Sequence, residues 1–224
     1  MPGEPYSIKL KPNPEPVHPR PFPIPQKHLN LMNGEVNHLI ELGLLRQAND
    51  LEWAAPSFGI PEKDNTILFV SDFTGLNKHV VRHPFPLPSI QDTIRIMSKF
   101  TYCTTLEMNM GYWSIPMLPE LQRICTIILP WGKFSYTCLP IGLAPSPDVY
   151  QEKMSLLFID LEEVKVYFDD ILFLGFDSLN DHLLILQEVS TPERKANLHV
   201  NVVKSKFEAI ETEYLGFNIF QQGV

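Results

Sequence analysis

The stretch VYFDDILFLG, residues 166–175, places two adjacent aspartates inside an otherwise apolar run. Such a run is typical of a buried strand, where a carboxylate is costly unless it is paired or bound to a metal ion. Two explanations are open for Asp169 and Asp170. They either form the polar turn of a hairpin between strands 164–168 and 171–175, since aspartate is common in turns, or they form a metal site at the tip of that hairpin.

A third carboxylate lies in another apolar segment, TYCTTLEM, residues 101–108, which we expect to be a strand. Phosphoryl transfer with two metal ions about 4 Å apart needs carboxylates from different strands, and Glu107 can supply one. The alternative is that Glu107 is simply exposed on an edge strand. Gly111, a few residues later, allows a close approach of the chain to a ligand, and Tyr112 can form a wall beside it.

Composition bounds the possible functions. The chain has 224 residues, of which 44% are hydrophobic, enough for one large domain or two small ones. Its net charge is -8, from 18 basic and 26 acidic residues, which argues against tight nonspecific binding of nucleic acid but allows a local basic groove. Three cysteines without a CxxC pair indicate neither a disulfide scaffold nor a zinc site. We therefore expect an intracellular protein, cytoplasmic or nuclear, with no membrane span because no apolar run reaches about 18 residues.

Periodicity predicts a mixed architecture. Nine of the 21 prolines fall within residues 1–25, which predicts an extended arm. A helix with its apolar stripe from Met32 to Ile40 follows, and Gly43 is expected to end it. Residues 57–60 and 66–73 are expected to be a pair of strands joined by a polar turn, and residues 146–158 a helix. A further helix is expected after Asp181, interrupted by Pro192, and a strand at 198–203. Helices and strands do not alternate strictly, so the fold class predicted is α+β.

Short motifs in a fixed order resemble one enzyme family. They are ELGLLRQANDLEWAAPSFGIPEKD (41–64), VSDFTGLNK (70–78), HPFPLPSI (83–90), LEMNMGYWSI (106–115), ILPWGKFSYTCLPIGLAPSPDVYQEKM (128–154), VYFDDILF (166–173), and VKSKF (203–207) with EYLGF (213–217). Over nearly the whole chain, they resemble the reverse transcriptase (RNA-directed DNA polymerase) of gypsy-like LTR retrotransposons. The resemblance implies right-hand polymerase fingers and palm, with an antiparallel palm sheet packed on helices.

The resemblance also implies a division of the chain. The arm of residues 1–25 precedes a fingers-like part, 26–100, and a palm-like part, 101–224, with a fingers insertion partly within 115–145. No segment resembling a thumb or an RNase H domain follows, so we expect such parts, if they are needed, from other domains of a polyprotein.

Roles follow from the same resemblance. Glu107, Asp169 and Asp170 are implied to be catalytic and to bind two Mg²⁺ ions, or Mn²⁺. The residues implied to contact the nucleotide or template are Lys63, Tyr112, Ile141, Gln151 and Phe168. Either Lys204 or Lys206 is implied to lie near the leaving pyrophosphate. The partners implied are an RNA or DNA template-primer and a dNTP, whose α-phosphate the primer 3′-OH attacks.

Three positions depart from the family pattern. Glu107 replaces an aspartate, and Leu68 and Thr74 replace arginines of which the first would bind the triphosphate. One extra methylene moves a carboxylate by about 1.5 Å, and Mg²⁺ requires near-ideal octahedral geometry. Three functions remain open: an active polymerase, an inactive remnant, and a degenerate copy repurposed to bind nucleic acid or protein. We expect the fold to be kept and the activity to be weak or lost.

Overall fold

The computed structural model describes residues 4–48, 52–63, 66–91, 93, 100–109, 111–184, 186–187, 196 and 198–221. The chain forms two compact units. One consists mainly of Pro84–Ser114 and Pro147–Val224, and we call it the carboxylate unit because it contains Glu107, Asp169 and Asp170. The other, Gly3–His83 with Ile115–Ser146, we call the arm unit. The chain therefore leaves the arm unit and returns to it before it completes the carboxylate unit.

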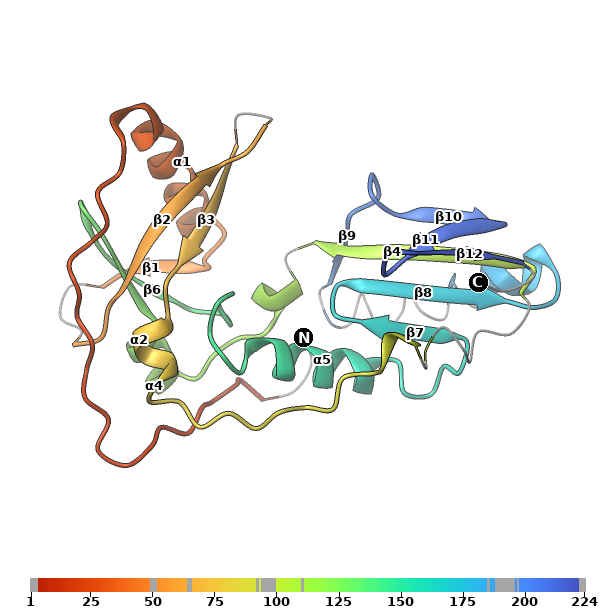
Figure 1. The fold of residues 1–224 in the computed structure, drawn as a ribbon, viewed down its shortest axis with the longest axis horizontal. Helices are drawn as coiled ribbons and strands as arrows, with labels where there is room; N and C mark the ends of the chain where they lie inside the picture. Colours follow the sequence, from red (N-terminus) through yellow and green to blue (C-terminus); the bar gives the residue numbers. More distant parts are fainter. Residues whose placement is uncertain are drawn as a thin grey trace. The chain divides into compact units, whose positions relative to one another are not determined.

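The arm unit is built on one five-stranded sheet (Figure 1). Its strands, in spatial order, are β1 (Leu45–Gln47), β6 (Gly132–Tyr136), β5 (Thr126–Leu129), β2 (Ala55–Pro61) and β3 (Ile67–Ser71). The pair β2–β5 is parallel, whereas the other pairs are antiparallel. The predicted hairpin around the turn after β2 is present, with Ser57 opposite Ser71.

Short helices and an extended segment complete the arm unit. The helices are η1 (Gln26–His28), α1 (Leu29–Glu41), α2 (Thr74–Asn77) and α4 (Pro119–Ile124). Helix α1 buries Met32, Val36 and Leu39, the predicted stripe, and Gly43 follows it with a φ of 72°. Residues 4–25 are not helical; main-chain hydrogen bonds attach this segment to Pro116, His79 and Ala54.

The carboxylate unit contains a second sheet, with strand order β10–β4–β8–β7 and β9 also paired to β4 (Figure 1). The strands are β4 (Tyr102–Asn109), β7 (Val164–Tyr167), β8 (Asp170–Gly175), β9 (His199–Val200) and β10 (Lys206–Ala209). Every pairing in it is antiparallel. The central strand β8 is buried on both faces from Ile171 onward, as its unbroken apolar sequence predicts.

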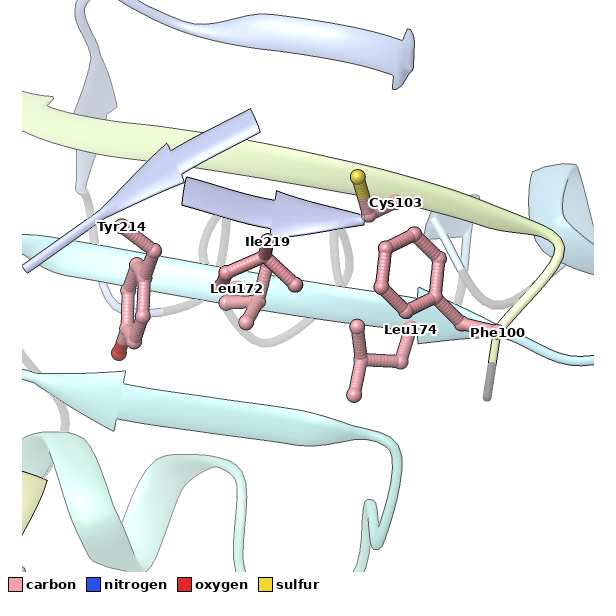
Figure 2. Close-up of a cluster of buried hydrophobic side chains, with 6 residues drawn as sticks. All are labelled: Phe100, Cys103, Leu172, Leu174, Tyr214 and Ile219. Atoms are coloured by element: carbon pink, nitrogen blue, oxygen red, sulfur yellow. The ribbon is translucent and has the colours of Figure 1, made fainter. Parts of the chain in front are cut away.

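The two faces of this sheet are covered by different elements. The hairpin of β11 (Glu211–Tyr214) and β12 (Phe217–Phe220) places Tyr214 and Ile219 against Leu172 and Leu174 of β8, and Figure 2 shows this apolar cluster with Phe100 and Cys103. Strand alternation directs Ile171 and Phe173 to the opposite face. Burial on both sides makes the strand a rigid support for the turn that precedes it.

Helix α5 (Ser146–Leu157) begins with Pro147 in its first turn. Its buried side chains Tyr150 and Met154, with Phe158 just after its end, follow one another at intervals of four residues, which is the spacing of one helical face. The same helix bears the buried amide of Gln151, which reaches the turn between β7 and β8. A short helix η2 (Gly111–Ser114) follows β4.

The prediction for the segment after residue 197 was wrong in part. The strand expected at 198–203 ends at Val200, and a turn over 201–205 leads into β10. A helix does follow Asp177, over residues 179–184, whereas Pro192 lies outside the described residues. Alternating apolar residues alone do not distinguish a strand from an anchored turn, and here local hydrogen bonds decide for the turn.

Candidate active site

A two-residue turn presents the first aspartate. Tyr167 of β7 and Asp170 of β8 are register partners, so Phe168 and Asp169 form the turn between them. Phe168 has a φ of 50°, a left-handed conformation that is uncommon for a bulky residue. Its N–H donates to the Gln151 side-chain oxygen at 2.7 Å, and the Gln151 amide donates to Val166 O. The buried glutamine therefore holds this strained turn in place from helix α5.

The second aspartate faces the glutamate of the neighbouring strand. Asp170 is the register partner of Glu107 in the antiparallel pair β4–β8. Directly opposite residues in such a pair have Cβ atoms about 5 Å apart and share one face of the sheet. Main-chain hydrogen bonding reinforces the junction, since Met108 N–H donates to Asp169 O at 2.7 Å. The sheet thus brings together three carboxylates that are separated by 62 residues in the sequence.

Asp169 is enclosed on one side by a tyrosine and a glycine. The Asp169 Oδ1 and Tyr150 Oη atoms are both buried, and neither has a hydrogen-bond partner among the described residues. A Cβ at Gly111 would lie 2.1 Å from Tyr150 Oη and 2.7 Å from Asp169 Oδ1, which no side chain allows. The close approach predicted at Gly111 therefore exists, but toward these two side chains of the protein itself.

Burial and like charge act together on the two aspartates. Burial raises the pKa of Asp169. The Tyr150 hydroxyl beside it opposes this shift in part, and the neighbouring charges of Asp170 and Glu107 raise the pKa further. The pKa of Asp170 is also raised, first by burial and then by Glu107, while Lys204 lowers it. Both shifts have the sign expected of carboxylates that lack sufficient positive charge nearby.

Glu107 has a cationic partner. The Lys204 ammonium donates to Glu107 Oε1, with 2.6 Å between Nζ and the oxygen. The lysine side chain is 61% exposed and the glutamate 34%, so that water reaches the pair. Neither the charge pattern nor the strand prediction indicated this contact, because it depends on the turn that carries Lys204.

The donor set was compared with what a divalent metal ion requires. Mg²⁺ and Mn²⁺ prefer carboxylate oxygens, and the buried, unpartnered Asp169 Oδ1 is such a ligand. Asp170, the next residue, is the first of strand β8 and offers a second carboxylate. Across the part of the chain that the structure describes, however, no three acidic, histidine or cysteine side chains are grouped to hold a metal ion. The two aspartates suit a hard cation, whereas Glu107 is engaged by Lys204.

Comparison with known proteins identifies the family. Residues 36–219 match the reverse transcriptase (RNA-dependent DNA polymerase) family. The chain belongs to this family. The Transposon Tf2-3 and Tf2-7 polyproteins of Schizosaccharomyces pombe are each 27% identical to this reverse transcriptase domain over 206 residues, 91% of the chain. The chain spans 15% of the length of each polyprotein.

Solved reverse transcriptases share the fold. The foamy viral protease-reverse transcriptase in complex with double-stranded DNA superimposes with a TM-score of 0.89 at 24% identity, covering 98% of this chain and 38% of that one. A native prototype foamy virus protease-reverse transcriptase gives 0.83 at 25% identity, over 94% of this chain and 28% of that one. These likenesses confirm the predicted α+β fold of polymerase fingers and palm.

The predicted nucleotide-binding residues of this reverse transcriptase domain lie in both units. In the carboxylate unit, Tyr112 stacks on Tyr150 with 4.7 Å between ring centroids, close to Asp169, and burial raises its pKa to about 12. Gln151 is fully buried and hydrogen-bonded to the turn, so its side chain supports Phe168 directly. The two others, Lys63 and Ile141, are exposed residues of the arm unit.

The two positions where the family pattern has arginine also lie in the arm unit. Leu68 is on β3 and is 49% exposed, so an arginine would fit there without repacking a core. Thr74 begins α2 and donates its N–H to Asp72 Oδ1 at 3.0 Å. Hydrogen bonds from the Thr74 side chain and main chain lower the pKa of Asp72. Threonine thus has a local structural role at this position.

Two residues of the site escaped prediction from the sequence. Tyr150 was predicted only as a residue of the helix over 146–158, because its position beside Asp169 and Gly111 depends on tertiary packing. Lys204 was proposed, with Lys206 as the alternative, for the leaving group rather than for Glu107. The described residues contain no helix long and apolar enough to cross a membrane.

Proposed function

We propose that this domain adds dNTPs to the 3′ end of a primer, with an RNA or DNA strand as the template, and that it does so slowly. The observation that carries the proposal is the rigid β7–β8 turn, which sets Asp169 and Asp170 against Glu107 of β4 within a reverse transcriptase fold. Positioned carboxylates on a buried sheet are what phosphoryl transfer requires, because most of its catalysis comes from positioning and charge neutralisation.

In the proposed reaction, the primer 3′-oxygen bonds to the α-phosphorus of the dNTP. The bond from that phosphorus to the bridging oxygen breaks, pyrophosphate leaves, and the hydroxyl proton passes to water. Asp169 and Asp170, and Glu107 once it is released from Lys204, would hold Mg²⁺ or Mn²⁺. When bound, these ions would neutralise the phosphate charge and lower the pKa of the attacking hydroxyl.

Protein side chains would select and orient the nucleotide. Tyr112, stacked on Tyr150, would close the space beside the sugar and exclude a ribose 2′-OH. The Phe168 backbone, held by Gln151, would fix the turn under the primer end. Lys63 and Ile141 are proposed to contact the triphosphate and the base. Other domains of a polyprotein are proposed partners.

We attribute the slow rate to three side chains. Glu107 is longer than the family's aspartate and is already paired with Lys204. Leu68 cannot provide the two parallel N–H donors with which arginine binds phosphate, and Thr74 carries no charge. A misplacement of about 1 Å in a positioned site costs on the order of 100-fold in rate.

Primer extension on a homopolymer template tests this proposal. The purified chain is compared with the double variant Glu107→Asp, Leu68→Arg, in Mg²⁺ and separately in Mn²⁺. We expect slow extension by the unaltered chain and a rate at least about tenfold higher for the double variant.

The matched control is Asp169→Asn in the double-variant background, which should abolish extension. If no protein extends the primer with either ion, the proposed polymerase activity is wrong. If the unaltered chain is as fast as the double variant, the proposed impairment is wrong while the polymerase activity stands.

A further inference from the structure

The 201–205 turn is built around the backbone of Glu107. Asn201 N–H donates to Glu107 O at 2.8 Å, and Glu107 N–H donates to Ser205 Oγ at 3.1 Å. Both polar groups of the Glu107 main chain are therefore bonded to the two ends of one turn. Strands β9 and β10 pair with β4 on either side of this point, at Met108 and at Thr105. The turn cannot shift along β4 without breaking these bonds.

The same turn is internally rigid, and it carries Lys204. The N–H groups of Lys204 and Ser205 donate to Asn201 O at 3.2 and 3.0 Å, and Ser205 Oγ donates to the same oxygen at 2.7 Å. Lys204 thus starts from a fixed backbone position beside Glu107, which lowers the entropic cost of its ion pair. The head of the lysine side chain, in contrast, is largely exposed to water.

Charge around the site points to what this lysine does. Three carboxylates lie at the ends of two strands, and Asp169 Oδ1 is buried without a hydrogen-bond partner among the described residues. Lys204 Nζ, 2.6 Å from Glu107 Oε1, is a cation bound to this group. The side chain of Glu107 is one methylene longer than an aspartate, so its carboxylate extends about 1.5 Å farther toward the lysine.

We infer that Lys204 is a positioning residue, an exchangeable counter-cation that keeps the Glu107 carboxylate in an ion pair until a divalent metal ion displaces the lysine. This inference rests on the proposed function, from which metal binding at the site follows. Metal affinity then includes the work of breaking the ion pair, and removing the lysine charge tightens binding.

Mn²⁺ alone, titrated into the full 224-residue chain and detected by electron paramagnetic resonance of the free ion, measures this without any turnover. Lys204→Gln keeps most of the side-chain length and removes the charge. We expect Mn²⁺ to bind about threefold to fivefold more tightly, the factor that an exposed ion pair contributes. Lys204→Arg keeps the cation and should bind Mn²⁺ as the unaltered chain does.

Two controls separate the ion pair from a general effect of charge. Lys206→Gln removes a lysine of β10, two residues away, and should leave Mn²⁺ affinity within a factor of two. In a Glu107→Gln background, Lys204→Gln should tighten Mn²⁺ binding by a smaller factor than in the unaltered chain, because the ion pair is already lost and only the effect of the lysine charge on the other carboxylates remains. Far-ultraviolet circular dichroism verifies that each variant is folded.

Equal tightening by Lys206→Gln, no tightening by Lys204→Gln, or no Mn²⁺ binding by any folded variant would overturn the inference. Primer extension decides the proposed function separately. If the chain extends primers but Lys204→Gln leaves its Mn²⁺ affinity unchanged, the proposed role of Lys204 is wrong while the polymerase activity stands.

Discussion

Asp169 Oδ1 and Tyr150 Oη are buried beside Gly111, and neither atom has a hydrogen-bond partner within the described part of the chain. A buried hydroxyl without a hydrogen bond destabilises the folded state, because in the unfolded chain water solvates the same hydroxyl. The same hydroxyl lies beside a carboxylate whose pKa is raised, first of all by burial. Stability and site chemistry are therefore linked at a single side chain.

Tyr150→Phe removes this hydroxyl and leaves the ring stacked on Tyr112. We expect the free energy of unfolding to rise by about 1 kcal/mol, because no hydrogen bond is lost and a desolvated polar group is removed. Urea denaturation measures the change. The contrasting control is Tyr136→Phe, whose buried hydroxyl bonds Ser71 Oγ at 3.0 Å and whose loss should destabilise by about 1 kcal/mol. A destabilised Tyr150→Phe would mean that Tyr150 donates to Asp169.

Gly111→Ala tests the close approach at the end of β4. The new Cβ would overlap with Tyr150 and Asp169, so we expect a loss of about 1–3 kcal/mol in unfolding free energy and a further fall in primer extension. Gly34→Ala is the matched control, because nothing lies within 4 Å of its Cβ position within α1. We expect Gly34→Ala to raise the free energy of unfolding by about 1 kcal/mol, because alanine favours the helix more than glycine does. Similar effects of the two substitutions would contradict the packing described.

The helical segment 179–184 packs on the sheet of the carboxylate unit through a buried histidine. His182, in the helical segment 179–184, is fully buried; its Nε2 lies 2.9 Å from Thr104 Oγ1, and its ring packs on Gly175. Its Nδ1 has no hydrogen-bond partner among the described residues. Burial lowers the His182 pKa below its ordinary 6.5, and the charge of Glu208 opposes this shift in part. The helix therefore docks with a neutral imidazole.

A pH dependence of stability follows, with a definite sign. Above 6.5 the histidine is neutral in both states, so its contribution is fully present. As the pH falls below 6.5, the unfolded chain gains a proton that the folded protein takes up only at a lower pH, and stability is lost. We expect the unfolding free energy to fall between pH 6.5 and about 5, and His182→Gln to reduce that fall. An unchanged slope in the variant would assign the effect to other groups.

The molecule as a whole combines a reverse transcriptase fold with a net charge of -8. Affinity for nucleic acid comes mainly from phosphate contacts by lysine and arginine, and it falls steeply with salt. We expect this chain to bind a fluorescent primer–template with a dissociation constant weaker than about 10⁻⁶ M at physiological salt, measured by anisotropy. Nanomolar binding under these conditions would show a basic groove strong enough to overcome the net charge.

Patterns in the sequence were sufficient for most of the architecture. Stripe and alternation predicted helix α1, the β2–β3 hairpin, β4, α5 and the strands around the aspartates, because local periodicity reports which side of each element is buried. Motif order predicted the family, which the comparison confirmed. The turn at 201–205 was missed, because its hydrogen bonds join Glu107 to residues about 100 positions later, and no local pattern records such a partner.

The sequence by itself predicted which carboxylates form the candidate site, and it places a glutamate at position 107. Only the tertiary structure decided their surroundings: Glu107 opposite Asp170 and bound to Lys204, and Asp169 enclosed by Tyr150 and Gly111. The physical reason is that charge and burial act through space. Glu107 contacts a lysine 97 residues away, and antiparallel pairing of β4 with β9 and β10 brings the two side chains together.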